Sequence, residues 1–371
     1  MNINYFEEKF WRNKELAHSM LCEIASLSQK INKSINIMEV CGTHTMSIAA
    51  SGIRNILPKN INLISGPGCP VCVTSAGDID RILKFPKINK NLIIATFGDM
   101  IKVPGSEKKT LSEAKAYGAD VRIVYSPLDC LRIAVENSRK EIIFIGVGFE
   151  TTAPLIAATV KEAHNKNIKN FSVAPLFKLV PPALRYLLDS KISKVDAFIL
   201  PGHVSAIIGY RPYFFLSKEY FMPGTIVGFE PLDILRGIIL ILKQIIYKDP
   251  ELKIEYSRAV SIGGNKTALK LMKDVYGTYD ADWRAIGPIK DSGYEFSKKY
   301  EKFDAFKKFC VAPIKAKEPA GCLCGKILLG LSKPVECSHF GKSCNPQHAI
   351  GPCMVSAEGA CAAWYKYGIK K

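Results

Sequence analysis

Residues 35–45 read INIMEVCGTHT, and this stretch decides the fold. Its apolar-rich first half ends at Val40, and Cys41, Gly42 and the threonine-flanked His44 follow at once. A short apolar run that leads into a glycine loop and a helix start is typical of a buried strand followed by a helix. The sequence therefore predicts a β-strand that presents a thiol at its carboxyl end.

The same pattern recurs about one strand-helix unit later. Residues 61–64 read INLI, and the loop GPGCPVC follows at 66–72. In a parallel sheet with right-handed crossovers, successive strand ends emerge at the same edge. We therefore expect Cys41, Cys69 and Cys72 to converge in one site.

Strands and helices alternate as far as residue 248. The first series has predicted strands at 35–40, 61–65, 92–97 and 121–125, and helices at 44–57, 75–85, 110–117 and 127–138. The second has strands near 141–147, 170–174, 196–200 and 225–228, and helices near 152–165, 181–190, 203–209 and 231–247. This alternation predicts an α/β fold with parallel sheets. We expect one domain at 35–138, a second at 139–248, and then a connector into a cysteine-rich tail.

Length and charge narrow the class of protein. The chain has 371 residues, for which two or three domains are expected. Its net charge is +17, but the lysines are interleaved with acids and accompany no DNA-binding motif, so we expect no nucleic-acid partner. The sequence begins MNINYFEEK, which is no signal peptide, and no apolar run reaches the roughly 20 residues that span a bilayer. These features predict a cytoplasmic protein without a membrane partner.

The thiols of the first series are candidate metal ligands. The N–H groups and dipole at a helix amino terminus are expected to lower the pKa of Cys41 and favour a metal-binding thiolate. His44 is a candidate proton carrier beside that thiol, although a capping or packing role is also open. Cys69 and Cys72 form a C-x-x-C motif, which suits a reversible disulfide or half a metal site. Redox chemistry or transient ligation is favoured, because no second C-x-x-C completes a zinc ribbon.

Polar residues also follow strands elsewhere. Glu150 lies in GFETT at 148–152, and His203 lies in PGHVS at 201–205. Both are candidate proton shuttles or anion-orienting groups in a cleft, and helix capping is the equal alternative. Asp99, after the predicted strand 92–97, has the same alternatives.

The tail concentrates half of the twelve cysteines. In a reducing compartment this density favours metal or redox chemistry over a disulfide framework. Four thiolates can hold a 4Fe-4S cluster, and a four-cysteine zinc site is the alternative. The six residues are Cys322, Cys324, Cys337, Cys344, Cys353 and Cys361.

These motifs together resemble the HypD family of nickel-iron hydrogenase maturation proteins. The matching blocks are 38–42, 66–72, 97–99, 121–127, 148–152, 201–205 and 228–233, and in the tail 324–325, Pro334, Cys337, 340–341, Cys344 and 354–361. They span nearly the whole chain. The resemblance implies two Rossmann-like α/β domains and a third, loop- and helix-rich iron-sulfur domain made of the chain ends, here 1–34 with 249–371.

The resemblance also implies a function. With the small partner HypC, the chain would form a scaffold on which iron becomes the Fe(CN)2CO moiety before transfer to the hydrogenase large subunit. Cyanide would come from HypE, itself supplied by HypF. Cys41 would anchor the iron, and Cys69 and Cys72 would supply redox equivalents or auxiliary ligation.

The resemblance assigns the tail cysteines as well. The 4Fe-4S cluster pattern of the family falls on Cys324, Cys337, Cys344 and Cys361. Cys322 and Cys353 would be an additional redox pair of the ferredoxin-thioredoxin-reductase type.

Two other functions are open on the residues alone. The first is an iron-sulfur dependent protein-disulfide reductase that uses the tail and the C-x-x-C pair. The second is a zinc-stabilised binding module. Whether the chain is an enzyme is undecided by its sequence.

Overall fold

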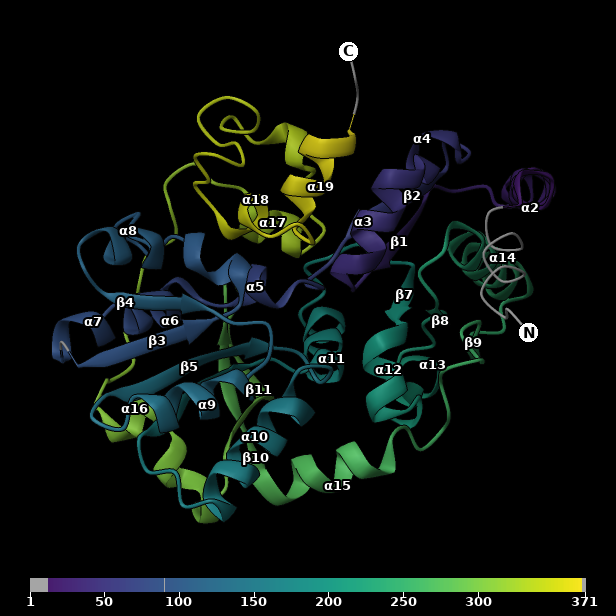
Figure 1. The fold of residues 1–371 in the computed structure, drawn as a ribbon. Helices are drawn as coiled ribbons and strands as arrows, with labels where there is room; N and C mark the ends of the chain where they lie inside the picture. The colour runs from purple at the N-terminus through teal and green to yellow at the C-terminus, as the bar shows by residue number, and fades with distance from the viewer. Residues whose placement is uncertain (1–12, 90, 369–371) are drawn as a thin grey trace.

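The computed structural model describes residues 13–89 and 91–368, and these form two parallel sheets flanked by helices (Figure 1). The five-stranded sheet has the order β2-β1-β7-β8-β9 and the four-stranded sheet the order β4-β3-β5-β6. The strands are β1 (Ile35–Glu39), β2 (Ile61–Ser65), β3 (Leu92–Thr96), β4 (Asp120–Ile123), β5 (Glu141–Gly148), β6 (Phe171–Phe177), β7 (Ala197–Pro201), β8 (Gly224–Val227) and β9 (Leu252–Ile254). The α/β fold class is confirmed.

Helices connect the strands. Up to the end of the four-stranded sheet they are α2 (Lys14–Gln29), α3 (Gly42–Ser51), α4 (Ile53–Ile56), α5 (Pro70–Val73), α6 (Ala76–Ile82), α7 (Phe85–Ile88), η1 (Gly98–Lys102), α8 (Leu111–Ala116), α9 (Asp129–Glu136) and α10 (Ala153–Asn165). Then come α11 (Val180–Ser190), α12 (Gly202–Ile208), η2 (Arg211–Tyr213), α13 (Phe214–Lys218), α14 (Pro231–Tyr247), α15 (Lys266–Val275), η3 (Lys298–Phe303), α16 (Ala305–Lys308), α17 (Cys324–Leu328), η4 (Pro334–Glu336), α18 (Pro352–Val355) and α19 (Ala360–Tyr367).

The sheets cut across the predicted division at residue 138. Strands β3 and β4 share one sheet with β5 and β6 of the predicted second domain, whereas β1 and β2 share the other sheet with β7, β8 and β9. Every predicted strand up to residue 228 is present, so the difference lies in which strands pair. A buried parallel strand has the same local pattern in either sheet, and that pattern does not encode its sheet.

The two sheets share a core. In β1, Ile37 belongs to a core built with α2 and α14, whereas its neighbour Met38 points to the other face. Ile143 of β5 packs in the same core as Met38. This shared core fixes the two sheets relative to each other, and with them the strand ends that carry the candidate site.

The segment after residue 248 contributes to both sheets. Its strand β9 completes the five-stranded sheet, and the antiparallel hairpin β10 (Tyr276–Trp283) and β11 (Gly287–Phe296) packs on β6. The N–H of Leu179 donates to the carbonyl oxygen of Ser292 over 2.8 Å. The hairpin was not predicted, because its strands carry many exposed polar residues and little apolar alternation.

The chain ends lie on different elements. Helix α2 packs against α14, whereas the yellow tail helices α18 and α19 pack against α5 and α3 (Figure 1). Charged and apolar residues at helical spacing predict a helix at 4–31. The structure shows it from Lys14 to Gln29, and residues 1–12 lie outside the described residues. A third domain that joins 1–34 to the tail stays a prediction.

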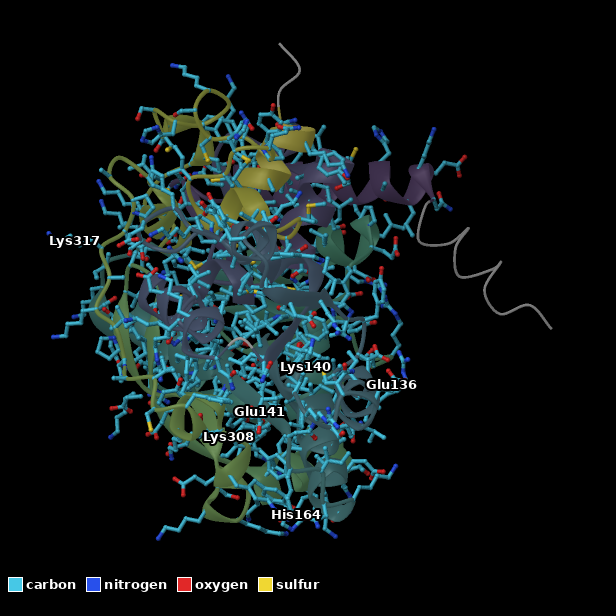
Figure 2. The ribbon with its side chains drawn as sticks, turned by 60° about the vertical axis from the view of Figure 1, so that its left-hand side comes forward. Glu136, Lys140, Glu141, His164, Lys308 and Lys317 are labelled. Atoms are coloured by element: carbon cyan, nitrogen blue, oxygen red, sulfur yellow. The ribbon has the colours of Figure 1, made fainter. Side chains whose placement is uncertain are left out.

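The surface is rich in paired lysines. Figure 2 shows Lys140, Glu141 and Lys308 on one face, where Lys308 lies 2.6 Å from Glu141 and Lys140 lies 3.0 Å from Asp120. Exposed pairs of this kind contribute only about 0–1 kcal/mol each. Within residues 13–89 and 91–368, none of the helices has the length and hydropathy needed to cross a membrane.

Candidate functional site

Cys41 and His203 lie at adjacent strand ends of the five-stranded sheet. Cys41 follows β1, and His203 follows β7, which pairs with β1 in parallel. The winding of the sheet reverses between these strands, since β2 lies outside β1 and β8 lies beyond β7. Open α/β sheets bind ligands at such a reversal, outside the carboxyl ends of the strands.

The four-stranded sheet has a reversal of its own, between β3 and β5. Asp99 follows β3 and Glu150 follows β5, so these two acids occupy its carboxyl edge. The hydroxyl of Ser356 in the tail donates to Asp99 over 2.8 Å. The tail therefore reaches the edge where both sheets present candidate residues.

The two thiol loops of the first series are in contact. The N–H of Gly42 donates to the carbonyl oxygen of Gly68 over 2.8 Å. A Cβ at Gly68 would lie 2.2 Å from the backbone nitrogen of Cys41, so only glycine allows this approach. Cys41 and Cys69 are thereby brought into one region, as the strand-end argument predicted.

The tight approach makes Gly68→Ala a test of loop contact. We expect this variant to lose about 1–3 kcal/mol or more of unfolding free energy, because the methyl group overlaps the Cys41 backbone. Gly98→Ala is the matched control, since its Cβ would meet nothing closer than 4.0 Å. The free energies of unfolding of both variants are measured by urea unfolding. Equal stability of the two would contradict the close packing of the loops.

The pKa of Cys41 differs from the prediction. Burial raises it to about 11, and the carboxyl of Glu358 adds to the rise, whereas the backbone N–H groups of His44 and Thr43 lower it less. Cys41 does cap α3 as expected, but desolvation outweighs the helix terminus. A thiolate at Cys41 therefore needs a bound cation in place of its proton.

Glu358 is a site residue that sequence reasoning missed. The hydroxyl of Thr43 donates to its Oε1 over 2.9 Å. A Cβ at Gly42 would come within 2.5 Å of the Cβ of Glu358. The tail thus covers the start of α3. The only sequence signal was the position of Glu358 in the family-like block 354–361.

Four further sulfur atoms form a row between α5 and the tail. The Sγ atoms of Cys69 and Cys72 lie 2.7 Å apart, and those of Cys324 and Cys353 also lie 2.7 Å apart. The thiols of Cys72 and Cys353 are hydrogen-bonding neighbours, which joins the two pairs. Disulfide exchange requires such contact between thiol pairs.

Which cysteines form the redox pair stays a prediction, and the resemblance implies Cys322 with Cys353. In the structure, the Sγ of Cys353 lies 2.7 Å from that of Cys324. The reason is local: Cys324 opens α17 with its side chain buried, whereas Cys322 lies in the preceding turn and is partly exposed. Spacing alone did not distinguish two cysteines that are two residues apart.

The tail cysteines line one cavity. Burial raises the pKa of Cys322 to about 12, with further increases from the nearby thiols of Cys324, Cys337 and Cys344. Within the described ranges, no three His, Cys, Asp or Glu side chains are arranged to hold a single metal ion. The cavity is lined by Cys322, Cys324, Cys337, Cys344, Cys353 and Cys361, together with His339 and apolar residues. A lining that contains six cysteines can supply the thiolate ligands that an iron-sulfur cluster needs.

His44 and His203 lie on opposite sides of one phenylalanine. Their rings stack on Phe229 at centroid distances of 4.8 and 3.8 Å. Nε2 of His44 lies 2.8 Å from the carbonyl oxygen of Gly228, and burial lowers the pKa of His44 to about 4. His44 is therefore a neutral, oriented imidazole, and His203 is the exposed member of the stack.

Glu150 is buried at the end of β5. Its Oε1 accepts the N–H of Val180 over 2.9 Å, and its Oε2 has no partner in the described part of the chain. Burial raises the pKa of Glu150 from its ordinary 4.5 to about 7. A carboxyl with this pKa can hold or release a proton near neutral pH.

This pKa predicts a pH dependence of stability. Between pH 4.5 and 7 the folded chain keeps a proton on Glu150 that the unfolded chain releases, so the free energy of unfolding falls as the pH rises. We expect Glu150→Gln to reduce the fall between about pH 5 and about pH 8 by about 2 kcal/mol. Urea unfolding across this range is the measurement, and exposed Glu251→Gln is the control. Parallel curves for wild type and Glu150→Gln would refute the assignment.

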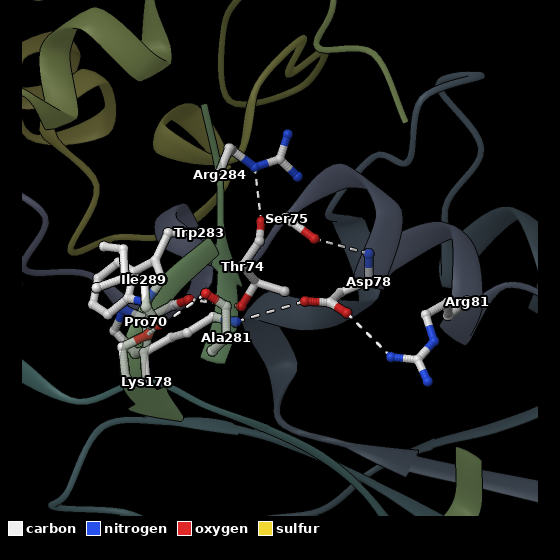
Figure 3. A network of polar contacts seen from close by, with 11 residues as sticks. Pro70, Thr74, Ser75, Asp78, Arg81, Lys178, Ala281, Trp283, Arg284 and Ile289 are labelled. Atoms are coloured by element: carbon white, nitrogen blue, oxygen red, sulfur yellow. Dashed lines mark hydrogen bonds and ion pairs between the residues drawn. The ribbon is translucent and has the colours of Figure 1, made fainter. Parts of the chain in front are cut away.

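A polar network lies next to α5, the helix of the C-x-x-C motif (Figure 3). Lys178 is fully buried, and its Nζ lies 3.6 Å from Asp78 of α6. Nε of Arg284, at the hairpin tip, donates to the carbonyl oxygen of Thr74 over 2.8 Å, just after α5. The first contact joins α6 to the residue that follows β6, and the second joins the end of α5 to the hairpin. Sequence could not reveal them, because the partners are far apart along the chain.

Comparison with known proteins agrees with this arrangement. The family model described as HypD, hydrogenase formation hypA family, matches residues 15–368. The chain is 42% identical over 342 residues to the hydrogenase maturation factor HypD of Escherichia coli, which covers 92% of this chain and 91% of that protein. It is 41% identical to HypD of Rhodobacter capsulatus, with 96% and 97% covered, and 41% identical to HypD2 of Bradyrhizobium diazoefficiens, with 99% and 97% covered. The chain therefore belongs to the HypD family of hydrogenase maturation factors.

Proposed function

We propose that this chain, together with HypC, is the scaffold on which iron acquires cyanide and carbonyl ligands for a nickel-iron hydrogenase. Iron is the cargo, and Cys41 is its anchor. One observation carries the proposal: the loop of Cys41 touches the loop of Cys69, and Cys69 begins a row of sulfur atoms that ends in the cysteine-lined cavity. Iron that carries cyanide and carbonyl is a soft, low-spin ion, which suits thiolate anchoring.

The row of thiols supports a two-electron exchange. With Cys324 and Cys353 as a disulfide, the thiolate of Cys72 attacks Cys353 and expels Cys324 as a thiolate. Cys69 then attacks Cys72, forms the Cys69–Cys72 disulfide and releases Cys353. The protons lost by the attacking thiols are taken up by the released ones, so electrons and protons balance. The reverse exchange uses the same contacts.

The remaining tail cysteines supply a ligand set for a 4Fe-4S cluster. When Cys324 and Cys353 act as a pair, the cavity retains Cys322, Cys337, Cys344 and Cys361. A cluster bound there would supply single electrons to a disulfide formed by the neighbouring cysteines. Cys337, Cys344 and Cys361 are buried, so these residues would hold the cluster away from water.

The proposal includes partners and a compartment. HypE delivers cyanide after HypF has supplied it, and the completed iron unit passes to the hydrogenase large subunit. The twelve cysteines suit the reducing cytoplasm. His44, Glu150 and His203 are the groups available to hold or move protons during ligand transfer.

The test is anaerobic co-purification of this chain with HypC, followed by iron and sulfide analysis and infrared spectroscopy. We expect bands of iron-bound cyanide and carbonyl, and about four cluster irons with matching sulfide in addition to the cargo iron. A complex that contains zinc, no sulfide and no such bands would refute both the scaffold and the cluster. That result would favour the zinc-stabilised binding module.

A second candidate is a protein-disulfide reductase of the ferredoxin-thioredoxin-reductase type. It is favoured specifically by the contact between Cys72 and Cys353, which links two thiol pairs. Turnover of a protein disulfide by this chain, without hydrogenase factors, would support it. Turnover that depends on HypC and iron would favour the scaffold.

A further inference from the structure

The imidazole of His44 is held at one nitrogen only. Nε2 lies 2.8 Å from the carbonyl oxygen of Gly228 and 3.2 Å from that of Val227. Carbonyl oxygens only accept hydrogen bonds, so Nε2 carries the hydrogen and Nδ1 of the neutral ring carries a lone pair. His44 is 0% exposed, and within the described residues Nδ1 has no partner. A buried acceptor without a donor is uncommon, which makes this ring a candidate functional group.

The peptide between Val227 and Gly228 connects this histidine to a carboxylate. Its carbonyl oxygen accepts from His44, and its N–H donates to Oε2 of Glu255 over 3.1 Å. A carboxylate on the N–H side of a peptide polarises the carbonyl on the other side, so the two hydrogen bonds strengthen each other. Glu255 therefore acts on His44 without touching it.

The fold fixes both ends of this connection. Glu255 directly follows β9, is 8% exposed, and donates its own N–H to Ile226 over 2.8 Å. A Cβ at Gly228 would lie 2.0 Å from Oδ2 of Asp233, so this loop has no room to shift. The ring of Phe229 then stacks on His44 and fixes its plane. The carboxyl ends of β1, β8 and β9 thus cooperate to orient one imidazole.

We propose that Glu255 is a positioning residue, which strengthens through the Val227–Gly228 peptide the preference of His44 for bearing its hydrogen on Nε2. Nδ1 is thereby kept as a free acceptor near the start of α3, which Cys41 caps. A role for Nδ1 of His44 in ligand transfer depends on the proposed function. The tautomer itself is a property of the chain alone.

Long-range proton-nitrogen NMR of the reduced chain, with histidine rings labelled by nitrogen-15, tests the proposal. The signals of His44 are those lost in His44→Gln. We expect the Nε2–H tautomer in the wild type, and a fall of about tenfold in its ratio to the Nδ1–H tautomer in Glu255→Ala. Glu255→Gln keeps an oxygen for Gly228 but loses the charge, so we expect a smaller change in the same direction. Glu251→Gln is the control, because this carboxylate at the other end of β9 is exposed and pairs with Lys253.

The outcomes separate the two proposals. His44 signals that are unchanged in both Glu255 variants overturn the positioning role. If Glu255→Ala fails to fold, Glu255→Gln decides alone, and wild-type signals in it overturn the role. A changed tautomer in Glu255→Gln with full iron-cyanide bands in the HypC complex supports the positioning role and refutes the use of His44 in assembly.

Discussion

Replacement of Cys41 by alanine is expected to reduce the infrared bands of iron-bound cyanide in the HypC complex to less than about a tenth of their wild-type intensity. Cys41 is the thiol at the reversal point of the five-stranded sheet, and the tail covers it through Glu358. Among the described residues no other cysteine lies at the end of β1, so in the proposed scaffold the removal of Cys41 leaves the iron without its anchor. Band intensity per mole of complex is the measurement.

The matched control is Cys310→Ala. Cys310 is exposed and lies outside the row of sulfur atoms, so its loss should leave the bands intact. Retention of full band intensity in Cys41→Ala would remove the central claim of the scaffold proposal. Loss of the bands in both variants would indicate a general effect of cysteine replacement, and would also count against a specific role for Cys41.

The second large effect is expected in the tail, where the proposed function and the resemblance assign different cluster ligands. Cys322→Ser should lose most of the cluster iron and sulfide, because a 4Fe-4S cluster needs four thiolates and no spare ligand remains. Cys324→Ser should keep both but lose the disulfide with Cys353. Iron and sulfide analysis together with titration of free thiols distinguishes these variants.

The reverse outcome is equally informative. If Cys324→Ser loses the cluster and Cys322→Ser keeps it, the pairing implied by the resemblance is right, and the contact between Cys324 and Cys353 is not a redox contact. Cys310→Ser serves again as the control for a cysteine outside the cavity. Loss of the cluster in Cys337→Ser is expected in either case, since that residue belongs to both ligand sets.

Much of the architecture could be predicted from local pattern. The apolar residues before Cys41 and before the loop of Cys69 correctly predicted the ends of β1 and β2. The second series of predicted strands correctly placed Glu150 after β5 and His203 after β7. Local pattern could not assign strands to sheets, because that depends on contacts such as the pairing of β1 with β7. The same limit applies to Glu255, which is a single acid in a charged segment until β9 brings it beside Gly228.

The pKa of Cys41 illustrates a different limit. Its position at a helix start is readable from sequence, and the expected effect of that position is present, since neighbouring N–H groups do lower the pKa. Burial depends on the tail, which lies more than three hundred residues away in the chain, as in the contact of Thr43 with Glu358. Desolvation by burial therefore raises the pKa of Cys41 more than the helix start, which the sequence correctly indicated, lowers it.

The interleaving of the two sheets has a consequence during synthesis on the ribosome. Strands β1 and β2 are made first, yet their partner β7 follows only after the whole four-stranded sheet, and the contact of Asn36 with Asp196 spans 160 residues. The four-stranded sheet can therefore form while β1 and β2 are still unpaired with β7. Until then, these two strands are exposed, aggregation-prone edges. Nascent chains that end before β7 should accordingly depend on chaperones more than those that end after β9.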